Sequence, residues 1–407
     1  MAENKVSERA ILFIVGAVQF VNILDFMILA PLGPRVAREL HMLESQLPDA
    51  TAAYTFAGGI AGIVGSFFLD RFDRRRALTI AALGLACGTA AGAMAHDLTE
   101  LIFARMLAGM FGGPATSLAI AVIADVIPAE RRGSAMGAIM GAFAAASVLG
   151  VPLGIGLAEI GGFRLPLLFV AGLGTLVAGA AWIFLPTLRG HLERPKTYKP
   201  RTYREMLRRP AVLSSYLMTA TVNAAFFALI PNVSTYMMNN LAFPEKQLKY
   251  MFLAGGLASL TTARLAGPLV DRKGSLRIAT VGSVLHIVVV FVGFATSVLP
   301  IPGAYLGGMY AMFVLFMFSN TLRTVALQTL TSRVPFPEER ARFQSLQSSV
   351  QHLSSAAGAS LSARMLTTTA DHRLVGVPHV AYVAIVGAAA LPFLMARVER
   401  LVRSDAP

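Results

Sequence analysis

Residues 65–76 read GSFFLDRFDRRR and residues 267–274 read GPLVDRKG. In each stretch the dipeptide Asp-Arg ends an apolar run, at 70–71 and again at 271–272, 201 positions later. Basic residues follow the dipeptide in both places, as expected at the cytoplasmic end of a membrane helix. The chain therefore contains two related halves, a common scaffold for membrane proteins that rock about a central site.

The composition places this scaffold in a membrane. Of the 407 residues, 55% are hydrophobic and only 14% are charged, whereas a soluble chain carries about 25% charged residues. A spanning helix needs ~20 largely apolar residues. We predict an all-α membrane protein with twelve such spans, at approximately 10–31, 49–69, 77–95, 99–122, 134–157, 166–186, 211–238, 249–270, 277–297, 304–331, 343–366 and 379–396.

A second repeated element supports the division into halves. The segment PAERR at 128–132 matches PEERA at 337–341, 209 positions later. A polar, basic stretch with prolines separates the sixth and seventh spans. We therefore predict an N-terminal six-helix bundle at 1–186, a cytoplasmic linker at 187–210 and a C-terminal six-helix bundle at 211–407.

The distribution of charge argues against nucleic acid as a partner, despite a net charge of +13. With the N-terminus inside, cytoplasmic segments hold 25 of the 35 Lys and Arg residues, and external loops hold six. This bias predicts that both termini are cytoplasmic. The basic run at 189–209 is interpreted as a linker near anionic lipid headgroups. The single cysteine, Cys87, excludes an intrachain disulfide.

Short motifs occur on the spans in a fixed order. They are LDF at 24–26 with PLGP at 31–34, the loop of Asp70, Arg71, Arg74 and Arg75, RMLAG at 105–109, Gly141 followed by GVPLG at 150–154, and the loop of Gly267, Asp271, Arg272 and Gly274.

These motifs resemble those of the major facilitator superfamily and, within it, the twelve-span proton-coupled drug and metabolite efflux group, of the sugar (arabinose) efflux permease type. The resemblance covers almost the whole chain. It implies a major facilitator fold of two six-helix bundles related by a pseudo-two-fold axis, in a multi-pass protein of a bacterial-type inner membrane that functions as a monomer. The first loop departs from the family motif, because Ser66 and Asp73 stand where the family has glycine.

The resemblance assigns a gating role to the loop residues Asp70, Arg71, Arg74, Asp125, Gly267, Asp271 and Arg272. Asp70 would face the start of the eleventh span near Phe343, while Arg71 or Arg74 would reach Asp125. Asp271 would mirror this arrangement near Ser134. Carboxylates are stabilised at helix N-termini, so such contacts would lock the cytoplasmic side. The alternative is simple positive-inside anchoring, which we prefer for Arg75 and Arg76.

Asp25 is the acidic residue placed deepest within a span. A carboxylate in hydrocarbon should face a cavity, pair with a cation or be protonated. Asp25 and Arg105 each lie about six residues from the external end of their spans, hence both ~9 Å below the outer surface. Burial disfavours the charged carboxylate and a guanidinium favours it, so a pair that changes with conformation could couple to protons. The alternative is a static pair that holds two helices in register.

The antiporter-like motif comprises Gly141, Gly150, Pro152 and Gly154. Small residues permit close helix approach and proline invites a bend. In the resembled family this segment is linked to sealing a leak path between substrate and protons. The alternative is ordinary helix packing.

The candidate substrate cavity is lined by amides, an aromatic ring and two arginines: Asn22, Asn223, Phe227, Asn232, Arg264, Asn320, Arg323, Gln347 and Gln351. Such a surface suits amphipathic molecules. Arg264 and Arg323 lie roughly 10–12 Å from the cytoplasmic ends of their spans. They could snorkel to the interface, or they could make the cavity positive and favour anionic or zwitterionic substrates.

The sequence thus predicts a secondary active transporter that exports a small organic molecule in exchange for protons by alternating access. The molecule would be a drug, a sugar-like metabolite or an anionic or zwitterionic amphiphile. One alternative is uptake by proton symport or facilitated diffusion, and another is a receptor or scaffold that does not transport. We find no zinc-type cluster, phosphate loop or nucleophile motif, so we expect no enzymatic activity, metal or cofactor, with the proton gradient as the energy source.

Overall fold

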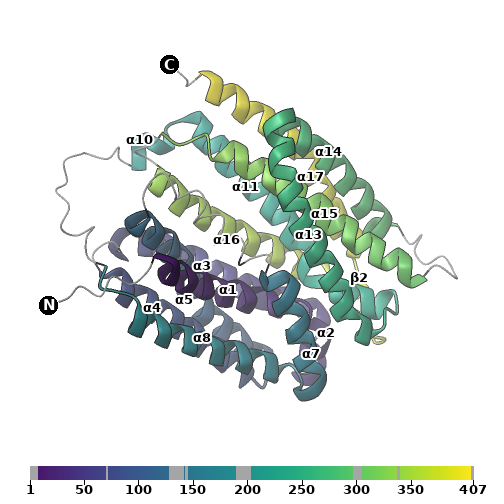
Figure 1. Ribbon diagram of the computed structural model, residues 1–407. Helices are drawn as coiled ribbons and strands as arrows, with labels where there is room; N and C mark the ends of the chain where they lie inside the picture. Colours follow the sequence, from purple (N-terminus) through teal and green to yellow (C-terminus); the bar gives the residue numbers. More distant parts are fainter. Residues whose placement is uncertain are drawn as a thin grey trace. The chain divides into compact units, whose positions relative to one another are not determined.

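The computed structural model describes residues 8–69, 72–127, 142, 145–188, 203–296, 305–336 and 340–404. The described chain is almost entirely helical (Figure 1). Its contacts divide it into two compact units, one of Met1–Met42 with Ala53–Tyr198 and one of Leu43–Ala52 with Lys199–Pro407.

The helices of the first half begin at the polar amino terminus and end before the linker. They are α1 (Glu8–Ile28), α2 (Gly33–Glu39), α3 (Leu47–Phe68), α4 (Arg74–Ala93), α5 (Leu98–Val126), the π-helical turn η4 (Ala146–Gly150), α7 (Val151–Gly161) and α8 (Arg164–Phe184), with the 3₁₀ turn η1 (Glu44–Gln46) before α3.

The second half repeats this succession of long helices. Its elements are α10 (Tyr203–Leu207), α11 (Pro210–Leu229), η5 (Ile230–Asn232), α12 (Val233–Thr235), η6 (Tyr236–Asn240), η7 (Glu245–Gln247), α13 (Leu248–Lys273), α14 (Ser275–Val290), η8 (Phe291–Ala295), α15 (Tyr305–Thr331), α16 (Arg340–Met365), β1 (Thr367–Thr368), β2 (Leu374–Val375) and α17 (Val377–Ser404).

Polar residues and one glycine set the helix ends. Asp73 caps α4 by accepting a hydrogen bond from the Arg75 backbone N–H at 2.8 Å, and Asp97 caps α5 through the Glu100 N–H at 2.8 Å. Gly274 separates α13 from α14 with φ +86°, a conformation that glycine adopts at little cost. These caps satisfy backbone donors that the helix itself leaves unpaired.

The structure confirms the predicted all-helical membrane fold. Eight described helical segments are long and apolar enough to cross a membrane. Three further helices have spanning length, namely α3 with 22 residues and α13 and α16 with 26 each. Every predicted span coincides with described helix, although the first part of the fifth span lies outside the described residues.

The two halves pair their helices in the same way. In the first unit α4 packs against both α5 and α8, and in the second α14 packs against both α15 and α17. Glycine permits the close approach of α4 to α5, since a Cβ at Gly88 would meet the backbone of Ala108. The matching pairs are what a duplicated six-helix unit requires.

Two short features were not predicted from the sequence. Helix α2 lies in the predicted first external loop, and strands β1 and β2 form an antiparallel hairpin between α16 and α17. The hairpin region belongs to the same unit as residues 43–52. The Ser45 N–H donates to Thr368 Oγ1 at 3.1 Å, and His372 Nδ1 lies 2.9 Å from Glu44 Oε1.

Candidate functional site

A buried ion pair joins α1 to α5 in the first unit. Arg105 Nη1 donates to Asp25 Oδ1 at 2.9 Å and to Oδ2 at 3.1 Å, and Nη2 donates to the Asp25 backbone carbonyl at 3.2 Å. The Asp25 side chain is 0% exposed and that of Arg105 is 2% exposed. The sequence predicted this pair because Asp25 and Arg105 lie at equal depth in their spans, and the structure places the two side chains in contact.

Thr89 of α4 supplies a third group to this site. Its hydroxyl lies 2.7 Å from Asp25 Oδ1 and 2.9 Å from the carbonyl oxygen of Leu85. A threonine hydroxyl has one hydrogen to donate and two lone pairs that accept. It can therefore donate to the carboxylate or to the carbonyl, but it serves only one fully at a time.

Tyr54 of α3 covers the other side of the arginine. The Arg105 guanidinium lies over the Tyr54 ring, 4.4 Å from its centroid, a favourable cation–π geometry. The Tyr54 hydroxyl donates to Asn22 Oδ1 at 3.0 Å, and Asn22 Nδ2 donates to Thr116 Oγ1 at 2.9 Å. Asn22, predicted to line the substrate cavity, thus lies in a buried network beside the ion pair.

Glycines on α5 make this close packing possible. A Cβ at Gly109 would meet the Tyr54 backbone carbonyl, and one at Gly112 would lie 2.6 Å from Asn22 Oδ1. The RMLAG motif therefore has a physical basis, because Arg105 binds α1 while the glycine four residues later lets α3 approach. Thr89 and Tyr54 were missed from the sequence, since neither belongs to a recognisable pattern.

The corresponding place in the second half is apolar. The residue 201 positions after Asp25 is Phe226 of α11, and its ring stacks on that of Phe316 of α15 with centroids 5.8 Å apart. An aromatic ring thus stands on α11 where the first half has the acid, and it contacts α15. The buried acid–base pair belongs to the first unit.

The predicted gates are described only in part. Asp70, Arg71, Ser134 and the side chain of Asp125 lie outside the described residues, so their contacts remain predictions. Arg74 is buried at the start of α4. Asp271 and Arg272 are exposed at the end of α13, and a Cβ at Gly267 would meet open space.

The antiporter-like motif packs around the acid-bearing helix. Gly141 lies outside the described residues. A Cβ at Gly150 would lie 2.6 Å from Leu24 Cδ1, and one at Gly154 would clash with Ile28. Pro152 stands in the first turn of α7, directly after the π-helical turn η4. The glycines thus bring η4 and α7 against α1 at positions flanking Asp25.

The remaining predicted cavity residues are distributed over the second unit. Gln347 Nε2 donates to Thr219 Oγ1 at 2.5 Å, Asn232 Nδ2 donates to Ser362 Oγ at 2.7 Å, and Asn223 Nδ2 donates within its own helix to the Thr219 carbonyl. Arg264 is exposed and Arg323 is buried, whereas Phe227, Asn320 and Gln351 are half-buried.

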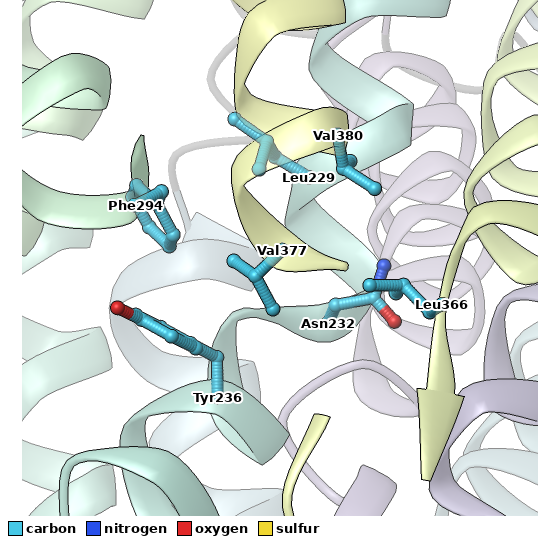
Figure 2. Close-up of a pocket in the computed structure, with 7 residues that line it drawn as sticks. All are labelled: Leu229, Asn232, Tyr236, Phe294, Leu366, Val377 and Val380. Carbon is cyan, nitrogen blue, oxygen red and sulfur yellow. The ribbon is translucent and has the colours of Figure 1, made fainter. Parts of the chain in front are cut away.

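Asn232 also lines a small pocket with Tyr236 (Figure 2). The other lining residues are apolar: Leu229, Phe294, Leu366, Val377 and Val380. The pocket has room for about one water molecule, far less than a substrate site needs. Within the described ranges, no group of three or more His, Cys, Asp and Glu residues could hold a metal ion.

Comparison with known proteins confirms the predicted family. The sequence profile of the Major Facilitator Superfamily matches residues 15–359. The chain is 26% identical over 246 residues to the inner membrane transport protein YdhP of Escherichia coli (strain K12), covering 60% of this chain and 62% of YdhP. It is 23% identical over 272 residues to the purine ribonucleoside efflux pump NepI of Escherichia coli O1:K1 / APEC, covering 66% of each. The matches thus span less than two thirds of these relatives.

The fold also resembles solved structures over nearly its full length. The crystal structure of the D-xylose–proton symporter superposes with a TM-score of 0.76 at 16% identity, covering 95% of this chain and 97% of that one. At this identity the likeness shows the fold alone, and it agrees with the major facilitator fold predicted from the sequence.

We predict that Gly154→Val destabilises the protein and Gly156→Val does not. The two glycines lie on α7, but a Cβ at Gly156 would meet nothing within 4 Å, whereas one at Gly154 would clash with Ile28. Overpacking of this kind costs about 1–3 kcal/mol. Thermal unfolding of the purified variants measures the difference, and equal midpoints would show that α7 does not pack against α1 at this position.

Proposed function

We propose that this chain, which belongs to the Major Facilitator Superfamily, is a proton-coupled secondary transporter that exports a small organic molecule from a bacterial cell across its inner membrane. No cofactor beyond the proton gradient enters the proposal. The observation that carries it is the fully buried pair of Asp25 and Arg105. A buried ion pair is weak evidence for stability, and an acid within a membrane span is by default a functional group.

The coupling step is protonation of Asp25. A proton that binds to a carboxylate oxygen removes the negative charge and leaves the Arg105 guanidinium buried without a counter-charge. An uncompensated buried charge is strongly destabilising. The protonated protein therefore shifts towards a conformation in which water or another acceptor reaches Arg105, and release of the proton on the other side restores the pair.

Thr89 keeps the site hydrogen-bonded in both states. When Asp25 is charged, the Thr89 hydroxyl donates to Oδ1. When Asp25 is protonated, its O–H donates to Thr89 Oγ1, and the Thr89 hydrogen turns to the Leu85 carbonyl, which lies 2.9 Å away. Neither protonation state then leaves the Asp25 carboxyl group or the Thr89 hydroxyl without a hydrogen-bond partner, which would cost ≈ 1–3 kcal/mol. Thr89 is thus a positioning residue that acts through Asp25.

Export is proposed because NepI is named as an efflux pump. Uptake by symport is the second candidate, because a protein named as a D-xylose–proton symporter has the same fold. A receptor or scaffold without transport is the third. The three differ in proton movement, since antiport moves protons against the substrate, symport moves them with it, and a scaffold moves none.

We predict that Asp25→Asn abolishes substrate-evoked proton movement. Purified protein in liposomes with an entrapped pH indicator would be exposed to a purine ribonucleoside, D-xylose, and anionic, zwitterionic and cationic amphiphiles in turn. Protons leaving wild-type vesicles as a compound enters would show antiport, and the variant should match protein-free liposomes. Unchanged proton movement in Asp25→Asn would refute the coupling role.

The single variant leaves Arg105 buried without its partner, at a cost of about 3–5 kcal/mol. The double variant Asp25→Asn/Arg105→Gln removes both charges, so it should regain thermal stability while proton movement stays absent. If the double variant regained both thermal stability and substrate-evoked proton movement, the role of the pair would be structural only.

We predict that Thr89→Val slows substrate-driven proton exchange about tenfold, since it removes a hydrogen bond to a charged group. Thr89→Ser should restore most of the rate, because it restores the hydroxyl. Thr175→Val is the matched control: the Thr175 hydroxyl also donates to the carbonyl four residues earlier, at 2.9 Å. Equal rates for Thr89→Val and Thr175→Val would contradict the role of Thr89.

A further inference from the structure

Arg323 of α15 is a buried cation for which the described residues supply no counter-charge. Its side chain is 1% exposed, and its Nε and Nη2 atoms make no hydrogen bond in the structure. No ion pair to Arg323 occurs among the described residues. The burial of these nitrogens also argues against snorkelling to the interface. Such a charge is costly within a membrane protein unless something compensates it.

The neighbours of Arg323 hold it in place without neutralising it. A Cβ at Gly282 of α14 would lie 2.9 Å from Arg323 Cγ, so the glycine makes room for the arginine stem. His286 lies one turn further along α14, and its Nδ1 atom is 2.9 Å from Ser319 Oγ. The Ser319 hydroxyl donates to the Phe316 carbonyl at 3.0 Å. Imidazole and hydroxyl groups carry no negative charge.

Two further polar atoms near this helix contact have no partner. Asn320 precedes Arg323 by three residues and therefore lies on the same side of α15, and its Oδ1 is buried and unbonded. Ser283 follows Gly282 on α14, and its buried Oγ is also unbonded. Buried polar groups are normally satisfied, so a ligand at Arg323 would find unbonded polar atoms on both helices.

The first unit offers a comparison, because it contains a buried arginine that is paired with an acid of the same chain. Arg105 has Asp25 at 2.9 Å, whereas Arg323 has no comparable acid in the described part of the second unit. Among the residues that the structure describes, none therefore supplies the anion that would pair with Arg323.

We propose that Arg323 binds an anionic group, a carboxylate or a phosphate, of the transported molecule. This inference rests on the proposed transport function and narrows its substrate to organic anions. A guanidinium matches both groups because its planar fork can donate two parallel hydrogen bonds. Ser283 and Asn320 would then contact the polar atoms next to the anionic group.

The test is binding, so it needs neither a proton gradient nor knowledge of the natural substrate. Purified protein in a non-ionic detergent would be titrated with sodium benzoate, sodium phosphate or benzylamine hydrochloride at constant ionic strength, and its thermal midpoint followed. A ligand that binds only the folded state raises the midpoint with concentration. We predict that at least one of the anions stabilises the wild type and that benzylamine does not.

Arg323→Met should lose this response, with affinity for the stabilising anion at least about tenfold weaker. Without ligand it should unfold no earlier than wild type, because it removes an uncompensated buried charge. If Arg323 only stabilised the fold, Arg323→Met would instead unfold at a lower temperature than wild type. Arg323→Lys should keep part of the response, and Arg264→Met, which alters an exposed arginine on α13, should keep all of it.

Equal stabilisation of wild type and Arg323→Met by the anion would overturn the proposal, as would a wild type that neither anion stabilises. If added phosphatidylglycerol stabilised the wild type and neither benzoate nor phosphate did, Arg323 would be assigned to a lipid headgroup, and the proposal would also be overturned. The double variant Asp25→Asn/Arg105→Gln separates the two proposals: it should still bind the anion, so anion binding and proton coupling fail independently.

Discussion

The desolvation of Asp25 and Arg105 is the constraint on which the rest of the first unit depends. Two charges without water are tolerated only when their geometry is good and their remaining hydrogen bonds are made. Here one guanidinium binds both carboxylate oxygens and a backbone carbonyl, Thr89 supplies a hydroxyl, and the Tyr54 ring lies against the cation. The glycines of α5 and α7 serve the same end, because they let α3 and α7 pack closely around these groups.

The two halves share their helix pairing and differ in their buried charges. The first unit holds a compensated acid–base pair. The second holds a stacked phenylalanine at the position that matches Asp25, together with a buried arginine for which the described residues supply no counter-charge. In the account proposed here, the first unit responds to protons and the second unit holds the anion. Duplication provides the frame, and the divergence of a few buried side chains provides the two chemistries.

Most of the spans could be predicted from the sequence because they are apolar runs of spanning length, and the Asp25–Arg105 pair could be predicted because both residues lie at equal depth. Other features could not. Thr89 and Tyr54 are ordinary residues in apolar helices, and only packing shows what they touch. The burial of Arg323 was left open since an apolar helix has no periodicity that marks one face. Helix α2 and the β-hairpin escaped notice because short loop elements carry weak local signals.

The central claim is that Asp25 takes up and releases a proton within the folded protein. Infrared titration of the purified protein in lipid tests it without any substrate, because a protonated carboxyl group has a carbonyl stretching band that a carboxylate lacks. The account predicts a band that grows as the pH is lowered while the protein stays folded, that is missing in Asp25→Asn and that shifts in Thr89→Val. A titration identical in wild type and Asp25→Asn would contradict the account.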